Sequence, residues 1–222
     1  GSVTNFFDAL FTSTSAVTVT GLTTLGTASY WSTTGHVIIA FLIQIGGFGI
    51  IGFATLVGFL IEGRISLKNR ISATSESSAT KQTDVKTLLL NIAKLMLFFQ
   101  LALFVFLTVR MFTEYGYSLE KALSHGAFQA ISAFNQAGFA LYTDSLMGFA
   151  NDGWIIFPVF VIATLAGFGF PVLAEIRDRL KLKLYVLFGK VADYTMPSQW
   201  SLNSRIILWA SLFLLVVGAI GI

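Results

Sequence analysis

The sequence lacks several residues on which common protein classes depend. It has no cysteine, so neither a disulfide scaffold nor a thiol-ligated metal site is available. Its two histidines, His36 and His125, lie far apart, and no HExxH motif or Cys/His cluster is present. Charged residues make up only 11% of the 222 residues, and the apolar stretches contain no convergent catalytic groups. Neither an enzyme nor a cofactor site is therefore predicted.

Apolar residues are abundant instead. They make up 55% of the chain, which is typical of a membrane protein. Four stretches approach the roughly 20 apolar residues that a helix needs to cross about 30 Å of hydrocarbon. They are residues 36–61, 88–112, 154–176 and 206–222. We therefore predict an all-α integral membrane protein that crosses the cell membrane several times.

The charged residues predict the orientation of these helices. Lys and Arg gather in the segments after the first and third stretches, whereas the other loops contain a single lysine, Lys121. Basic loops tend to remain in the cytoplasm, so both basic segments are predicted to be cytoplasmic. The net charge of +3 then follows from topology, and no nucleic-acid partner is needed. Asp144 and Asp152, at the predicted outer mouth, could attract cations or could simply be solvated.

Two charged residues lie inside the second stretch, Lys94 and Arg110. Their separation along a helix axis is about 24 Å at ~1.5 Å per residue. That distance excludes a functional pair, so each is predicted to extend to its own membrane interface.

The segment 118–141, SLEKALSHGAFQAISAFNQAGFAL, is too short and too polar to cross the membrane. It begins with a predicted cap at Ser118 and an acid at Glu120, and its apolar residues recur at helical spacing. We predict a half-helix that dips into the membrane and returns as an extended segment at 135–139. His125, on this half-helix, is interpreted as a packed side chain rather than a ligand.

A similar pattern occurs near the start of the chain, in TSTSAVTVTGLTT at 12–24. Placing Gly138 on Gly21 aligns Phe128 with Phe11, Ser132 with Ser15 and Ala133 with Ala16. With three residues added in the connecting loop, Gly167-Phe168-Gly169 aligns with Gly47-Phe48-Gly49. The chain therefore contains two copies of one unit, which consists of a helix, a half-helix, an extended loop with glycine, and a second helix.

The extended loop needs a special environment. Irregular backbone at membrane depth is tolerated only where it is buried in protein or lines a water-filled cavity. Carbonyl oxygens that point at an axis can replace the hydration shell of a cation, and threonine hydroxyls can add ligands. Glycine permits the required backbone angles, and the half-helix directs the negative end of its dipole to the same place. We interpret Thr18-Val19-Thr20-Gly21 as one wall of a cation filter.

Three separated segments, TSAVTVTGL, LIQIGGFGI and ISAFNQAGFAL, resemble the Trk/Ktr/HKT superfamily of potassium transporters. Within it, LIQIGGFG favours the membrane subunit of the bacterial Ktr uptake system. The resemblance covers nearly the whole chain and implies potassium uptake through a channel-like pore of four such units. It also implies a homodimer and a cytoplasmic regulatory ring that binds nucleotides. No cofactor is implied; K⁺ is the transported ion, with Na⁺ as a conceivable coupling ion. The filter positions implied are Thr18, Val19, Thr20 and Gly21 in the first unit and Asn135, Gln136, Ala137 and Gly138 in the second.

The predicted organisation follows from this resemblance. Two filter loops cannot close a four-sided ring, so we expect a fragment that lacks the third and fourth units, with their gating loop and pore-lining arginine. Assembly from two or more copies is the alternative. The expected segments are a first pore unit at 1–62, a cytoplasmic linker at 63–87, a second pore unit at 88–180, a second linker at 181–205 and the leading helix of a third unit at 206–222.

The two loops differ in chemistry. The first keeps the Thr-Val-x-Gly pattern of potassium channels, whereas the second keeps only the glycine and has Asn135, Gln136 and Ala137 in the other positions. Our hypothesis is one well-formed cation site near Gly21 and Gly138, with moderate selectivity for potassium over sodium. A related sodium/potassium symporter and a non-transporting membrane scaffold are the alternatives. A scaffold would not explain two matching half-helix and loop units.

Several other features allow two interpretations. The glycines of the first span, Gly46, Gly47, Gly49 and Gly52, could form a hinge, but we favour close helix packing. In the later copy, Gly167 and Gly169 with Pro171 predict a bend. The polar run 72–84 is predicted to be a flexible linker. That run and the basic segment 177–190 could contact a regulatory subunit.

Overall fold

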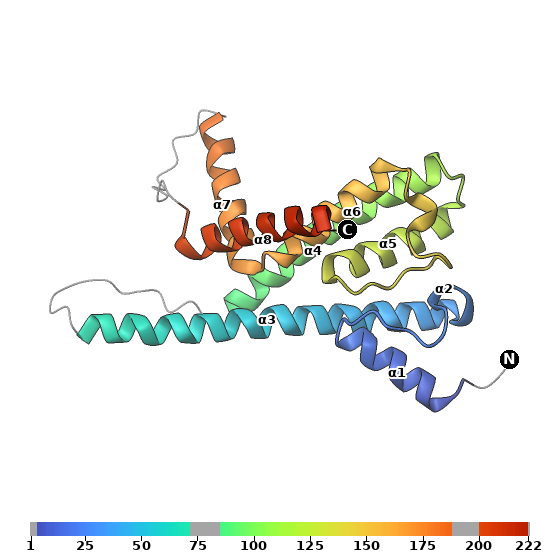
Figure 1. The fold of residues 1–222 in the computed structure, drawn as a ribbon, viewed down its shortest axis with the longest axis horizontal. Coiled ribbons are helices and arrows are strands. Elements are labelled where there is room, and N and C mark those ends of the chain that lie inside the picture. Colours follow the sequence, from blue (N-terminus) through green and yellow to red (C-terminus); the bar gives the residue numbers. More distant parts are fainter. Residues whose placement is uncertain (1–3, 72–84, 188–199, 222) are drawn as a thin grey trace. The chain divides into compact units, whose positions relative to one another are not determined.

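A computed structural model of the chain describes residues 4–71, 85–187 and 200–221. All regular structure in these residues is helical, which confirms the predicted fold class. The helices form two compact units, Gly1–Ala163 and Thr164–Ile222. In chain order the elements in Figure 1 are α1 (Phe6–Val17), α2 (Thr27–Tyr30), α3 (Thr33–Ile71), α4 (Val85–Thr113), α5 (Leu119–Asn135), the 3-10 turn η1 (Met147–Phe149), α6 (Gly153–Gly167), α7 (Phe170–Leu187) and α8 (Leu202–Gly221).

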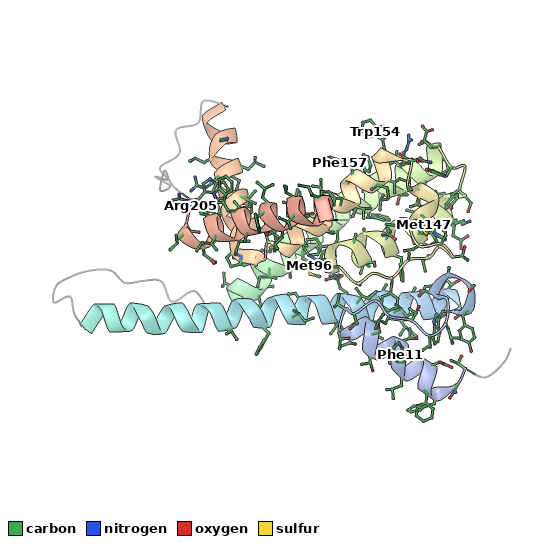
Figure 2. All side chains as sticks on the ribbon, viewed as in Figure 1. Phe11, Met96, Met147, Trp154, Phe157 and Arg205 are labelled. Carbon is green, nitrogen blue, oxygen red and sulfur yellow. The ribbon has the colours of Figure 1, made fainter. Side chains whose placement is uncertain are left out.

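The helices match the predicted membrane crossings. Within the described residues, three helices are long and apolar enough to span a membrane, over Thr33–Ile50, Leu89–Thr113 and Leu202–Gly221. The pair Gly153–Gly167 and Phe170–Lys183 gives a fourth if it is counted as one broken span. Large apolar side chains such as Phe98, on α4, are exposed, and Trp154 and Phe157 point outward from α6 (Figure 2). These surfaces suit contact with lipid.

Four helices extend beyond the predicted segment limits, and one of them is α4, which begins at Val85 rather than at 88. α3 continues to Ile71, past residue 62, α7 continues to Leu187, past residue 180, and α8 begins at Leu202 rather than at 206. Hydropathy locates the part of a helix that suits lipid, but the backbone bonds of a helix can continue into water. The predicted flexible run 72–84 and residues 188–199 of the second linker lie outside the described residues.

The half-helices α1 and α5 both begin with a side-chain cap, and for α5 this is the predicted residue, Ser118. The Asn5 side chain accepts a hydrogen bond from the Phe7 amide at 3.3 Å, and Ser118 accepts one from the Lys121 amide at 3.3 Å. In Figure 1, α1 packs on α3, while α5 packs along α4 and also contacts α3. α3 is therefore the element that both half-helices share.

The apolar core of the first unit divides into two clusters. One joins α4 and α5 with η1 and the start of α6, and it includes Leu107, Met111 and Ile155. The other gathers α1, α3, α5 and the loop after α5 around one point, and its buried members are Ala16, Ile39, Ile43, Phe128, Ala137, Phe139 and Leu141. This second cluster fixes the two extended loops against the helices that carry them.

The glycine-rich parts of the two copies behave differently, as predicted. α3 continues as one helix through its glycines, so they do not form a hinge there. In the later copy the helix breaks between Gly167 and Phe170, where Gly169 has a φ of +79°. A φ in this region favours glycine, and Pro171 lacks the backbone donor that a continuous helix would use.

In the unit Thr164–Ile222, Glu175 connects α7 to the start of α8. Its carboxylate accepts hydrogen bonds from the Ser201 amide at 3.1 Å and the Ser204 hydroxyl at 2.5 Å, and it pairs with Arg179 at 3.0 Å. Ser201 caps α8, because its hydroxyl oxygen accepts the Ser204 amide at 3.2 Å. This polar junction holds the corner between the two helices.

Candidate functional site: two extended loops at half-helix ends

The first loop leaves α1 through residues with positive φ. Val19 has a φ of +56° and Gly21 a φ of +79°. Two backbone hydrogen bonds shape this exit, from the Val19 amide to the Ala16 carbonyl at 3.3 Å and from the Thr20 amide to the Ser15 carbonyl at 2.9 Å. The hydroxyls of Thr18 and Thr20 are 2.7 Å apart. The loop is therefore a defined non-helical backbone.

The second loop repeats this backbone at equivalent positions. Gln136 has a φ of +57° and Gly138 a φ of +73°. The Gln136 amide donates to the Ala133 carbonyl at 3.2 Å, and the Ala137 amide donates to Ser132 at 2.8 Å. Each contact is the counterpart of one in the first loop when Gly138 is placed on Gly21. The conformation thus supports the internal repeat inferred from the sequence.

Side chains anchor the second loop more extensively than the first. The Ser132 hydroxyl donates to the Phe139 carbonyl at 2.6 Å, inside the protein, and fixes the return of the chain. The Gln136 side chain donates to the Ala163 carbonyl of α6 at 2.9 Å. Asn135 and Ala137 are buried, whereas Gln136 and Gly138 are exposed. The alternation leaves one face of this loop uncovered by the described residues.

The two loops meet at their glycines. A Cβ atom built on Gly138 would lie 3.5 Å from the Cα atom of Gly21, and one built on Gly21 would lie 3.2 Å from the Cα atom of Gly138. The Gly21 position is also closed by the carbonyl oxygen of Ala137. The structure therefore brings Gly21, Ala137 and Gly138 together. It places Thr18, Val19 and Thr20 on one loop and Asn135 and Gln136 on the other.

Two consecutive glycines of α3 receive the ends of both half-helices. A Cβ atom on Gly46 would overlap the carbonyl oxygen of Val17, the last residue of α1. A Cβ atom on Gly47 would overlap the side-chain amide of Asn135, the last residue of α5. The preference for close packing over a hinge is confirmed here, since α3 stays helical at both positions. One short stretch of α3 thus sets the position of both loops.

A buried polar cluster beside the second loop was missed in the sequence. The Gln44 side-chain oxygen, on α3, accepts hydrogen bonds from Gln100 of α4 at 2.9 Å and from Asn135 at 3.4 Å. The Gln44 side-chain nitrogen donates to the sulfur of Met96 at 3.6 Å. The sequence did contain a sign of this cluster, which is a glutamine within each of two apolar spans, in LIQIGG and FFQLAL. Such residues usually hydrogen-bond across membrane helices.

Arg110 and Asp152 form an ion cluster at the ends of α4 and α6. The Arg110 guanidinium lies 3.1 Å from Asp152 and 3.0 Å from Glu114. Asp152 also accepts the Tyr115 hydroxyl at 3.0 Å and caps α6 through the Trp154 amide at 2.9 Å. Burial tends to raise the pKa of Asp152, but these donors outweigh it and hold the pKa below its usual value. Asp152 is therefore engaged by partners, in contrast to the solvated or cation-attracting side chain expected, and Arg110 is paired.

Lys94 and His125, two other polar residues singled out in the sequence, lie in simpler surroundings. Lys94 is exposed on α4. His125 packs between the rings of Tyr117 and Tyr142, with ring centroids 5.7 Å and 5.1 Å away. This location agrees with its interpretation as a packed side chain.

Comparisons with known proteins agree with the sequence resemblance. A family model described as a cation transport protein, TrkH, matches residues 1–222. The chain is 30% identical over 213 residues to Ktr system potassium uptake protein B of Vibrio alginolyticus. The matched region covers 96% of this chain and 44% of that protein. It is 36% identical over 192 residues to potassium/sodium uptake protein NtpJ of Enterococcus hirae. That match covers 86% of this chain and 42% of the relative. Ktr system potassium uptake protein D of Bacillus subtilis is 32% identical over 202 residues, and that match covers 89% of this chain and 45% of the relative. The chain spans less than half the length of these relatives.

Proposed function

Since the chain belongs to the TrkH family of cation transport proteins, we propose that it forms part of a pore for potassium uptake across the cell membrane. In this proposal the loops at 18–21 and 135–138 are two walls of a selectivity filter. Their backbone carbonyl oxygens replace the water around a dehydrated K⁺ ion. Its relatives are transporters, and the chemistry proposed here is binding and release of an ion.

The observation that carries the proposal is the matched backbone of the two loops and their contact at the glycines. Both loops follow the C-terminal end of a half-helix, where the helix dipole is negative and favours a cation. Gly21 and Gly138 share a left-handed conformation that other residues rarely adopt. Two equivalent walls in contact are what a filter with repeated units around one axis requires.

The remaining walls must come from elsewhere, because the two loops make up half of a four-sided ring. We propose that they come from further repeats of the same transporter, since the relatives are more than twice as long as the matched region. The basic segments at 63–87 and 181–205 are proposed to face the cytoplasm. By the resemblance to Ktr membrane subunits, the transporter is proposed to be a homodimer that works with a nucleotide-binding regulatory subunit.

Coupled potassium and sodium transport is the second candidate. The relative from Enterococcus hirae is named a potassium/sodium uptake protein. The second loop also has Asn135, Gln136 and Ala137 where the first has Thr18, Val19 and Thr20, so the two walls offer different ligands. Potassium uptake that requires Na⁺ in proteoliposomes would favour this candidate, whereas uptake in sodium-free buffer would favour potassium alone.

The test compares two glycines in the intact transporter, expressed in cells that lack potassium uptake. Gly21→Ala places a Cβ atom against the other loop, whereas Gly116→Ala places one in space that is open among the described residues. Both glycines have positive φ, at +79° and +60°, so both substitutions place alanine at a left-handed backbone position. We expect Gly21→Ala to reduce potassium over sodium preference roughly tenfold, equivalent to about 1.4 kcal/mol. Equal preference in the two variants would contradict the filter assignment.

A further inference from the structure

Asn135 occupies a junction between three helices at the start of the second loop. Its side-chain nitrogen lies 2.9 Å from the Ile131 carbonyl in its own helix and 3.4 Å from the Gln44 oxygen on α3. The same Gln44 oxygen accepts Gln100 of α4 at 2.9 Å. A single oxygen atom thus receives donors from two other helices.

Most of the cluster is shielded from water. Asn135 and Gln100 are each 7% exposed, and Gln44 is partly buried. In such surroundings, a side-chain amide that loses its hydrogen-bond partner destabilises the protein by its full desolvation penalty, because no water replaces the partner. Gly47 completes the arrangement, because any side chain there would displace the Asn135 amide. The position of Asn135 is therefore determined by α3 and α4 as well as by α5.

The first loop is held differently. Its equivalent residue, Thr18, donates to the Thr14 carbonyl at 2.8 Å within its own helix, and its hydroxyl also contacts Thr20. The polar side chain of Thr18 therefore bonds locally, whereas that of Asn135 bonds to a neighbouring span. This difference cannot be seen from the aligned loop sequences alone.

We propose that Gln44 and Gln100 are positioning residues that set the place of the second filter loop and thereby the discrimination between potassium and sodium. The inference rests on the proposed function. Discrimination by a carbonyl filter depends on the number and placement of its oxygens, so a small displacement of Asn135 alters selectivity. In this proposal the two glutamines act through Asn135 and not as ligands of the ion.

The experiment measures uptake by the intact transporter carrying Gln44→Leu, Gln100→Leu or Gln100→Asn. Gln100→Asn keeps a buried amide but shortens it by one methylene, so it remains informative if a leucine variant does not accumulate in the membrane. Thr108→Val is the matched control. It removes another buried contact of α4, the 3.4 Å hydrogen bond from Thr108 to the Ala122 carbonyl of α5.

The selectivity ratio is the half-saturating Na⁺ concentration divided by the half-saturating K⁺ concentration. We expect it to fall three- to tenfold in the glutamine variants, roughly the effect of one lost hydrogen bond. Maximal K⁺ uptake per transporter should remain within about twofold of the native value, because only ion discrimination is altered. Thr108→Val should keep the native ratio.

Three results would overturn the inference. The first is a selectivity ratio that stays at the native value both in Gln100→Asn and in each leucine variant that accumulates in the membrane. The second is an equal loss of ratio in Thr108→Val, which would indicate a general packing effect. The third is the absence of K⁺ uptake by the native transporter, which overturns the proposed function as well and is thereby distinguishable from the other two.

Discussion

The two glycines of α3 that receive the half-helices give the sharpest structural prediction. Gly46→Ala would place a Cβ atom 2.7 Å from the carbonyl carbon of Val17 and 2.9 Å from its Cα atom. Carbon atoms pack best at about 3.5–4.0 Å. The Val17 carbonyl oxygen lies closer still, so the end of α1 would have to move away from α3 by more than ~1 Å. Because the obstacle is backbone, no side-chain rotation relieves it.

The cost can be worked out from these contacts. Forcing an extra methyl group into a packed interior typically costs about 1–3 kcal/mol. Alanine in place of glycine also favours a helix by up to ~1 kcal/mol. We therefore expect Gly46→Ala to destabilise the protein by about 1–2 kcal/mol net. Gly49→Ala, on the same helix, meets nothing within 4 Å among the described residues and should be neutral or slightly stabilising.

Gly47→Ala differs, because its obstacle is a side chain. The new Cβ atom would lie 2.5 Å from the Cγ atom of Asn135, whose amide could rotate only by losing its hydrogen bonds to Gln44 and Ile131. Replacing Asn135 by alanine in the same protein removes the obstacle. The double variant should recover part of the stability that Gly47→Ala loses, whereas Gly46→Ala has no such rescue.

The assay is thermal unfolding of the purified transporter in detergent, combined with uptake selectivity in cells. Gly46→Ala and Gly47→Ala should unfold at lower temperature than Gly49→Ala and should lose potassium preference. If Gly46→Ala were as stable and as selective as Gly49→Ala, the reasoning that α3 fixes both half-helix ends would be refuted.

Two further perturbations test the parts around the loops. Ser132→Ala should destabilise the protein by about 1–3 kcal/mol, because the buried Phe139 carbonyl loses its 2.6 Å partner; unchanged thermal unfolding would show that the hydrogen bond is unimportant. For Asp152, donors hold the folded-state pKa below its usual value. Its contribution to stability is therefore complete above the unfolded pKa of about 3.9 and is lost as the pH falls through the lower folded pKa. Unfolding temperature should fall with pH below about 4 in the native protein and fall less in Asp152→Asn; parallel profiles would contradict this role.

Much of the helical fold could be predicted from the sequence because lipid imposes strong local rules. The apolar stretches, the Ser118 cap and the break near Gly169 each depend on residues close together in the chain. The alignment of Gly138 with Gly21 also predicted the shared loop conformation, since both loops carry the same short-range pattern. The helix ends were less predictable, because α3 continues to Ile71 beyond its apolar part.

The polar contacts between helices could not be predicted in the same way. Gln44 and Gln100 lie in different spans, and only the packing of α3 beside α4 makes them partners. Arg110 was expected to extend alone to the interface, but the loop before α6 brings Asp152 to it. Each pairing depends on tertiary structure, and a single sequence identifies the polar residue without identifying its partner.

The most direct test of the proposed filter is to locate the ion. A structure of the intact transporter in potassium, compared with one in sodium, should reveal ion density at the level of Gly21 and Gly138 in potassium only. Carbonyl oxygens of both loops should surround that density. Equal density in the two salts, or density away from these loops, would contradict the account.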